Sequence, residues 1–236
     1  MHADRRTAPS LVVAVDGPSG VGKSSTARGV ARRLGLRYLD TGAMYRAVAW
    51  WMLEHHVPVD DAGAVAAHCG KLTIVSGTDP SAPTIHVDDV DVATAIRTQE
   101  VTHAVSPVSA VPEVRTRMVA LQREVVSDDE TGIVVEGRDI GSVVWPDAAV
   151  KVYLTADPVA RAARRHAELT GGTDARRSAT VAETQRALAR RDAIDSGRAT
   201  SPLAVAEDAV VVDSTDLTLE EAISTIVDLA EAHRGS

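Results

Sequence analysis

The stretch Leu11-Val-Val-Ala-Val-Asp-Gly-Pro-Ser-Gly-Val-Gly-Lys-Ser-Ser25 decides the fold of this chain. It opens with an unbroken apolar run, and a short β-branched run of this kind predicts a strand that is buried on both faces. The residues that follow, 26–34, have helical spacing, and Gly35 stands where a glycine commonly ends a helix. The stretch therefore predicts a buried strand, a glycine-rich turn and a helix in direct succession.

The turn between this strand and this helix matches the phosphate-binding pattern G-x-x-x-x-G-K-[ST]. Its glycines let backbone N–H groups approach phosphate oxygens, and the helix N-terminus adds partial positive charge. Lys23 is expected to reach the β- and γ-phosphates of a nucleotide and the Ser24 hydroxyl to ligate Mg²⁺, while Asp16 is a further candidate for holding Mg²⁺ through water. A glycine-rich turn with no ligand is the alternative, but it explains neither the lysine nor the hydroxyl. The residues expected around the nucleotide phosphates are Gly17, Pro18, Ser19, Gly20, Val21, Gly22, Lys23, Ser24 and Ser25.

The composition is that of a globular protein with few large aromatic side chains. The 236 residues are 44% hydrophobic and 25% charged, and they suffice for one domain with small insertions. Only 3% are aromatic and none is Phe, so the core is expected to consist of Ala, Val, Leu and Ile. A net charge of −8 argues against a general nucleic-acid binder. Because nearly all basic residues are arginine, an anionic ligand would have to be held by arginines gathered locally.

Cysteine content and hydropathy bear on where the protein works. The single cysteine, Cys69, permits no internal disulfide and fits the reducing cytoplasm. No apolar run is long enough to span a membrane. Residues 1–9 are polar and lack the apolar core of a signal peptide, so they are expected to form a flexible tail.

Strands and helices alternate along the rest of the chain, which predicts a doubly wound α/β core with a parallel sheet. Three short segments at 72–75, 84–87 and 90–92 favour a small antiparallel sheet, which we interpret as an insertion. The remaining core strands are expected at 36–40, 133–136, 150–154 and 209–213. Helices are expected at 47–56, 60–70 and 113–126, from Pro158, after a capping box of Thr180 with Glu183, and after a second box of Thr218 with Glu221.

Two further polar clusters stand at the ends of predicted strands. Thr41 and Arg46 could hold a second phosphate group opposite the glycine-rich turn; the alternative is that Thr41 caps a helix and Arg46 is a solvated surface residue. Gly137-Arg138-Asp139 follows strand 133–136, at the edge where ligands bind in open α/β sheets. A structural ion pair is the alternative interpretation of that cluster.

Arginines also gather in the segment 160–173. Arg161, Arg164 and Arg165 precede Gly171-Gly172. This arrangement is typical of a mobile lid that closes over transferring phosphates. The competing interpretation is the basic face of an ordinary helix.

Taken together, these motifs resemble those of bacterial cytidylate kinases, which are nucleoside monophosphate kinases. The matching patterns are D-G-P-S-G-x-G-K at 16–23, L-D-[ST]-G-x-x-Y-R at 39–46, I-R-[TS]-x-x-V at 96–101, G-R-D at 137–139 and R-D-x-x-D-x-x-R at 191–198. They occur in the family's order over nearly the whole chain. The chain departs from the family where Ala193, Ile194 and Ser196 replace residues that are often charged.

The resemblance implies a P-loop kinase that moves the γ-phosphoryl group of ATP to CMP or dCMP with Mg²⁺. The implied fold is a single α/β domain over 1–236, in which helices flank a five-stranded parallel sheet. Its core would be 10–40, 98–160 and 176–236, its monophosphate-binding region with the small sheet 41–97, and its lid 161–175. A cytoplasmic monomer that binds neither nucleic acid nor membrane is also implied.

The resemblance further assigns roles to side chains. The base would be read by Ser106, Arg115 and Asp139. The CMP phosphate would be held by Thr41, Arg46, Arg138 and Arg198, and the sugar hydroxyls by Arg191 and Asp195. Arg161 would join the phosphate loop at ATP, and the transferring phosphate would be neutralised by Lys23, Arg138, Arg164, Arg165 and Arg191.

Two other classes of protein share parts of this pattern. A shikimate-like or adenylate-like kinase would account for the phosphate loop and the lid, but not for the combined set of motifs. The other class is a regulatory GTPase or ATPase switch. A GTPase would need an Asn-Lys-x-Asp motif to read guanine, and the chain contains no asparagine.

Overall fold

The computed structural model describes residues 11–128, 130–170, 180–198 and 200–235; the tail expected at 1–9 lies outside these ranges. Its centre is a five-stranded sheet with the strand order β2-β6-β1-β7-β8. All neighbouring strands pair in parallel, which confirms the predicted α/β core. The strands are β1 (Val12–Asp16), β2 (Arg37–Asp40), β6 (Ile133–Glu136), β7 (Val150–Thr155) and β8 (Val210–Asp213).

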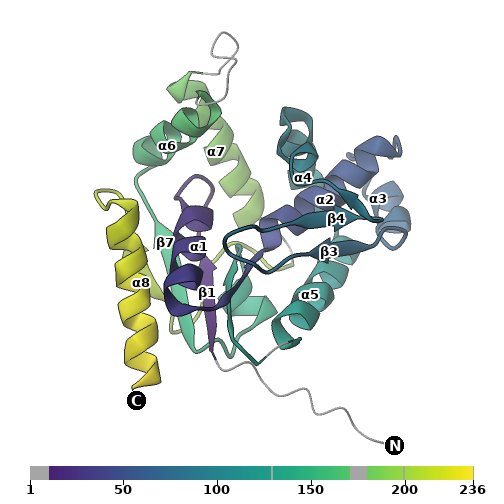
Figure 1. Ribbon diagram of the computed structural model, residues 1–236. Coiled ribbons are helices and arrows are strands. Elements are labelled where there is room, and N and C mark those ends of the chain that lie inside the picture. Colours follow the sequence, from purple (N-terminus) through teal and green to yellow (C-terminus); the bar gives the residue numbers. More distant parts are fainter. Residues whose placement is uncertain (1–10, 129, 171–179, 199, 236) are drawn as a thin grey trace, which may run out of the picture.

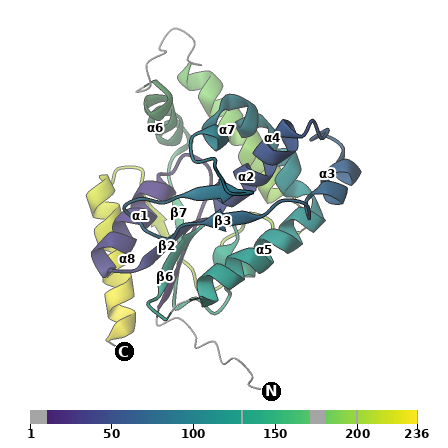
Figure 2. The same ribbon diagram turned by 45° about the vertical axis from the view of Figure 1, so that its right-hand side comes forward.

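Helices cover both faces of this sheet because its central strand is apolar on both. Val13 and Val15 of β1 pack in one buried cluster together with residues of α1 (Lys23–Leu34) and α8 (Leu219–Arg234). Val12 and Ala14 point to the opposite face and pack in the larger cluster, below α2, α4 and α5. Figures 1 and 2 show α1 and α8 on one side of the sheet and α5 on the other. The helices that pack on the larger cluster are α2 (Thr41–Glu54), α4 (Gln99–Ala110) and α5 (Pro112–Ser127).

Polar caps fix where several helices begin. Thr180 and Thr218 form the two predicted capping boxes, which open α7 (Val181–Ser196) and α8. The carboxylate of Asp157 accepts a hydrogen bond of 2.7 Å from Val159 N at the start of α6 (Pro158–Thr170). Helix α2 begins at Thr41, earlier than expected, because the carboxylate of Asp40 accepts from Ala43 N and caps it. The alternative in which Thr41 is the cap is therefore wrong.

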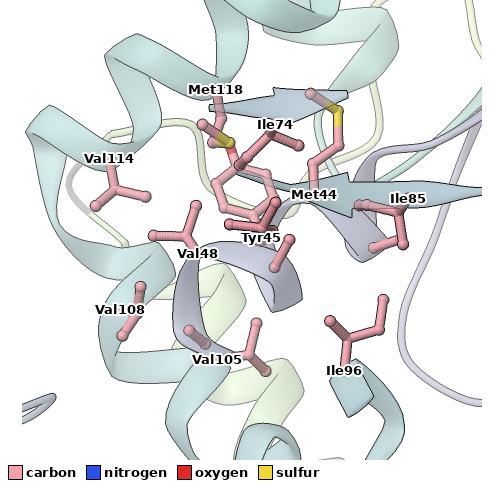
Figure 3. Packing of buried hydrophobic residues seen from close by; sticks show 14 of the residues in the cluster. Met44, Tyr45, Val48, Ile74, Ile85, Ile96, Val105, Val108, Val114 and Met118 are labelled. Carbon is pink, nitrogen blue, oxygen red and sulfur yellow. The ribbon is translucent and has the colours of Figure 1, made fainter. Parts of the chain in front are cut away.

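The predicted insertion is a three-stranded antiparallel sheet, β3-β4-β5, that packs on α2. Figure 3 shows Ile74 and Ile85 of this sheet beside Met44 and Tyr45 of α2. The loop between β3 and β4 is fastened to the core, because Tyr38 N donates to Thr78 O at 2.9 Å. The elements of this region are α3 (Ala62–His68), β3 (Ile74–Ser76), β4 (Ile85–Val87), β5 (Val90–Asp91) and the 3₁₀ turn η1 (Ala95–Arg97).

The remaining short element is η2 (Ile140–Val144), a π-helical turn after β6. Among the residues that the structure describes, no helix has both the length and the apolar character needed to cross a bilayer. The helices α6 and α7 pack against each other and stand above the sheet in the view of Figure 1. The loops between strands and helices at that end of the sheet form the candidate site.

Replacing Gly17 by alanine should destabilise the fold. The added Cβ would lie 2.1 Å from the carbonyl oxygen of Leu154 in β7, at a backbone φ of +148°. Backbone strain and displacement of β7 should together lower the free energy of unfolding by about 2–5 kcal/mol. Gly35→Ala is the matched control, since its Cβ would meet no atom within 4 Å and only its φ of +66° is unfavourable. Equal losses in urea unfolding would show that the approach to β7 is no constraint.

Candidate functional site

A cleft lies at the carboxyl ends of β1, β2 and β6, where loops and helices from distant parts of the sequence meet. Its walls come from the phosphate loop, the start of α2, α4, α5, the turn after β6, and α6 and α7. Most of the predicted site residues line it. They are Ser19, Gly20, Gly22, Lys23, Ser24, Ser25, Thr41, Arg46, Arg115, Arg138, Asp139, Arg165, Arg191, Asp195 and Arg198.

Besides Asp16, which is described below, six predicted site residues do not line this cleft. Gly17, Pro18 and Val21 belong to the phosphate loop but lie behind its surface, and Arg161 and Arg164 bind other parts of the protein. The sixth is Ser106, which is buried on α4. One turn further along α4, Ser109 lines the cleft instead: its hydroxyl accepts from Arg198 at 2.8 Å and its carbonyl from Arg115 at 3.4 Å.

The phosphate loop has the backbone shape that its glycines were expected to allow. Gly20 and Gly22 have φ values of +80° and +89°, and Gly22 is the N-cap of α1. A Cβ at Gly22 would meet no atom within 4 Å, so glycine is required there by the backbone angle. Lys23 follows directly and donates from Nζ to Pro18 O at 2.7 Å. Burial lowers the pKa of Lys23, and the nearby charges of Arg138 and Arg191 lower it further.

Half-buried arginines line the cleft together with the phosphate loop. Burial lowers the pKa of Arg46 to about 10 and that of Arg191 to about 9, and neighbouring arginines add to both shifts. The Nε atoms of Arg191 and Arg198 are buried and have no hydrogen-bond partner in the described part of the chain. Cations that are desolvated and repel one another are stabilised when an anion binds beside them. The cleft is therefore built to receive negatively charged groups.

Arg46 and Thr41 are both held by hydrogen bonds at the start of α2. The guanidinium of Arg46 donates to Ile96 O at 3.3 Å and to Thr102 Oγ1 at 3.0 Å, so it is fixed from η1 and α4. Thr41 Oγ1 donates to Glu136 O at 2.7 Å. Neither side chain is a solvated surface group, which was the alternative for Arg46.

At the far end of the cleft, Arg115 of α5 forms a buried ion pair with Asp139. The two side chains are 3% and 6% exposed, and the Arg115 guanidinium lies 5.3 Å above the centre of the Tyr45 ring. Burial raises the pKa of Asp139, and the charge of Arg115 opposes this shift. Burial also raises the pKa of Tyr45, to about 12. This end of the cleft thus offers an aromatic ring, a carboxylate and a guanidinium together.

Arg138 and Asp139 are adjacent in the sequence but do not form an ion pair with each other. Arg138 instead donates from Nε to Asp195 at 3.0 Å and from Nη2 to Ser19 Oγ at 2.8 Å. Asp195 also binds Arg198, so one buried carboxylate holds two guanidinium groups of the cleft. The alternative of a local pair between Arg138 and Asp139 is therefore wrong.

The arginines of the predicted lid lie in different places. Arg165 lines the cleft. Arg164 donates to Ser214 Oγ at 3.1 Å and to Thr215 O at 3.2 Å, next to the end of β8, and Arg161 donates to Ser19 O at 3.1 Å. Residues 171–175 of the predicted lid, including Gly171-Gly172, lie outside the described residues.

Asp16 does not take the role expected of it at a metal. Its carboxylate accepts from Ile140 N at 2.9 Å and from Gly141 N at 2.8 Å, and it is buried away from the cleft lining. It therefore ties the turn after β6 to the end of β1. That tie sets the path of the chain just after Arg138 and Asp139.

Side chains with oxygen atoms that could hold a metal line the cleft together with Ser24. Ser24, Asp40 and Glu136 all line the cleft, and the Tyr38 hydroxyl donates to Glu136. Burial raises the pKa of Glu136 to about 7. Mg²⁺ keeps several water ligands and binds through few protein oxygens and substrate phosphates, so this donor set fits it. No group of three or more His, Cys, Asp or Glu side chains suited to a metal occurs within the described residues.

Tyr45, Asp40 and Glu136 are among the cleft residues that the motifs leave unassigned, although the sequence carries a signal for each. Tyr45 lies inside the quoted motif 39–46, of which only Thr41 and Arg46 had been assigned. Asp40 and Glu136 are carboxylates at the last positions of β2 and β6, where ligands of α/β proteins commonly bind. An acidic residue at the end of a predicted strand is therefore the signal that points to both Asp40 and Glu136.

Similarity to known proteins agrees with the arrangement of the cleft. A family model described as cytidylate kinase matches residues 13–232. A cytidylate kinase of Streptomyces avermitilis is 59% identical over 231 residues, which cover 98% of this chain and 97% of the relative. One of Nocardia farcinica is 51% identical over 217 residues, which cover 92% and 91% of the two chains. A solved structure of an uncharacterized protein from Eubacterium ventriosum shares the fold alone, with a TM-score of 0.51 and 9% identity over 94% of this chain and 99% of that chain.

Replacing Asp16 by asparagine should change how stability depends on pH. Burial raises the pKa of Asp16 from 3.8 to about 6, against the opposing effect of the two amides. A raised pKa stabilises the native state below about pH 4, and this contribution is lost as the pH rises through about 6. The unfolding free energy of the wild type minus that of Asp16→Asn, taken with its sign, should therefore fall by about 2–3 kcal/mol from about pH 4 to about pH 7. A constant or growing difference in urea unfolding would contradict this assignment.

Proposed function

This chain belongs to the cytidylate kinase family and transfers the γ-phosphoryl group of ATP to CMP or dCMP, and we propose that its cleft performs the transfer by alignment and charge neutralisation alone. The observation that carries the proposal is that a phosphate loop and half-buried arginines line one and the same cleft. Phosphoryl transfer needs two anions brought into line and little covalent help from the protein. An oxygen of the CMP phosphate bonds to the γ-phosphorus of ATP while the bond to the β-phosphate oxygen breaks and ADP leaves.

We assign the ATP phosphates to the phosphate loop and the start of α1. Their oxygens would bind backbone N–H groups near Gly20 and Gly22, beside the positive end of the helix. Lys23 would exchange its contact with Pro18 O for the β- and γ-phosphates, which would offset the charges that now lower its pKa. Arg138, Arg165 and Arg191 line the same cleft and would neutralise the charge that develops on the transferring group.

We assign CMP to the opposite wall, with its phosphate at Thr41, Arg46, Arg138 and Arg198. Arg191 and Asp195 on α7 would contact the sugar hydroxyls. The base would enter the end of the cleft at Tyr45, where the carboxylate of Asp139 can accept from the amino group of cytosine and Arg115 can donate to its N3 and O2.

Mg²⁺ would be held by the Ser24 hydroxyl and the ATP phosphates, and Asp40 and Glu136, which line the same cleft, would accept from its water ligands. The bound ion would supply positive charge that offsets the charge of the ATP phosphates during the transfer. Arg161 and Arg164 would act from the base of the predicted lid 161–175. We further propose the division into core, monophosphate-binding region 41–97 and lid for this domain, and a cytoplasmic monomer without nucleic-acid partners.

A coupled assay that detects ADP and offers CMP, dCMP, UMP, AMP or shikimate as acceptor tests this function. We expect rapid ADP formation with CMP or dCMP and slow formation with the other acceptors. Rapid ADP formation with AMP or shikimate, or without any acceptor, would contradict the proposed substrate.

Replacing Lys23 by alanine should lower turnover by about 100-fold or more, because the charge of Lys23 stabilises the transition state. The fold should persist, since Lys23 is a buried cation whose pKa is lowered and whose removal relieves repulsion with Arg138. Lys71→Ala is the control, as Lys71 is exposed and outside the cleft lining. Near-native turnover of Lys23→Ala in the coupled assay would refute the role of this lysine.

Asp139→Asn should narrow the preference for CMP over UMP, measured as the ratio of kcat/KM for the two acceptors. Uracil presents a carbonyl where cytosine has its amino group, and asparagine can donate to that carbonyl. Mismatched buried polar groups discriminate strongly, so the ratio should fall by about tenfold or more. Both acceptors are measured on one preparation, so a reduced folded fraction cancels in the ratio. An unchanged ratio would leave Asp139 as a structural partner of Arg115.

A further inference from the structure

Asp192, which the roles above do not use, lies where α7 meets the phosphate loop. One carboxylate oxygen, Oδ1, accepts from Ser19 N at 3.0 Å, and the other pairs with Arg161 of α6. Arg161 also donates to Ser19 O at 3.1 Å. The N–H and the C=O of Ser19 are therefore both bound, by side chains from two different helices. These three residues, Ser19, Arg161 and Asp192, form a closed set of contacts that we call the Ser19 clamp.

Tight packing surrounds the clamp. A Cβ on Gly20 would lie 3.1 Å from Leu188 Cδ1 of α7 and 3.2 Å from the carbonyl oxygen of Arg161. The side chains of Arg161 and Asp192 are only 11% and 16% exposed. Displacement of α6 or α7 toward the loop would therefore move the phosphate loop with it.

The clamp connects to groups that would touch both reacting phosphates. Ser19 Oγ accepts from Arg138 Nη2 at 2.8 Å, and Arg138 is also bound to Asp195 on α7. Arg191, the neighbour of Asp192 in α7, lines the cleft. Asp192 thus ties α7, which carries Arg191 and Asp195, to the phosphate loop, whose Ser19 side chain binds Arg138.

We propose that Asp192 is a positioning residue for phosphoryl transfer: with Arg161 it fixes the Ser19 peptide, so that the phosphate loop and the arginines of α7 hold donor and acceptor in line. The inference rests on the proposed function of the cleft. A carboxylate suits this place because it accepts from an amide and a guanidinium at once, through two charge-assisted hydrogen bonds. Asparagine keeps one acceptor oxygen for Ser19 N but loses the ion pair with Arg161. Alanine loses both contacts.

Steady-state kinetics of Asp192→Asn and Asp192→Ala toward ATP and CMP test this role. We expect kcat to fall in the order wild type, Asn, Ala, with a loss on the order of tenfold to a hundredfold for alanine, because small misplacements of reacting groups are costly. The KM for CMP should stay within about twofold, since Asp192 is outside the cleft lining. Amide hydrogen exchange at Ser19 should become faster in the same order.

Glu220→Gln is the matched control, because it breaks the pair of Glu220 with Arg33 between α8 and α1, away from the cleft. It should leave kcat and Ser19 exchange unchanged. If alanine at position 192 lowers the melting temperature more than the control does, the asparagine variant decides. A kcat within twofold of wild type in both variants, a loss shared by Glu220→Gln, or a rise in KM without a fall in kcat would overturn the inference. A wild-type protein that does not phosphorylate CMP would instead refute the function.

Discussion

The cleft depends on keeping several cations close together in a buried place. Lys23, Arg46 and Arg191 are desolvated and repel their neighbours, so their pKa values are lowered. Carboxylates placed between the cations make this arrangement tolerable: Asp195 binds Arg138 and Arg198, and Asp139 binds Arg115. Breaking one buried pair would leave an uncompensated charge, which is strongly unfavourable. The requirement for counter-charges explains why carboxylates such as Asp139 and Asp195 stand among the basic side chains of a cleft whose ligands are anions.

The sequence predicts the local elements of this structure but not the ion pairs that hold the cations of the cleft. Strand and helix periods are local, so the five parallel strands, the small sheet and both capping boxes follow from the residues in each segment. Ion pairs of the cleft join positions far apart in the chain, such as Arg138 with Asp195. No periodic pattern encodes that choice of partner. The adjacent Arg138 and Asp139 suggest a local pair, but Arg138 binds Asp195 on α7 and Asp139 binds Arg115 on α5.

The sequence also does not show whether a given side chain reaches the cleft or is buried behind it. Asp16 stands directly before the phosphate loop, and its position in the sequence suits a carboxylate near a metal. Whether it reaches the cleft depends on the turn after β6, whose amides at Ile140 and Gly141 occupy both of its oxygens. The spacing of Arg161, Arg164 and Arg165 likewise suggested one shared task, but on α6 only Arg165 reaches the cleft lining.

The hydrogen bonds also show how separate regions can act on one reaction centre. Arg46 is fixed by Ile96 and Thr102, which follow the small sheet, and the Ser19 clamp fixes the phosphate loop from α6 and α7. Each wall of the cleft therefore takes its position from a region inserted between strands of the core. A rigid parallel sheet provides a common base for these regions, because β1, β2 and β6 end side by side. The alignment of the two phosphates then depends on how these two regions pack on the sheet.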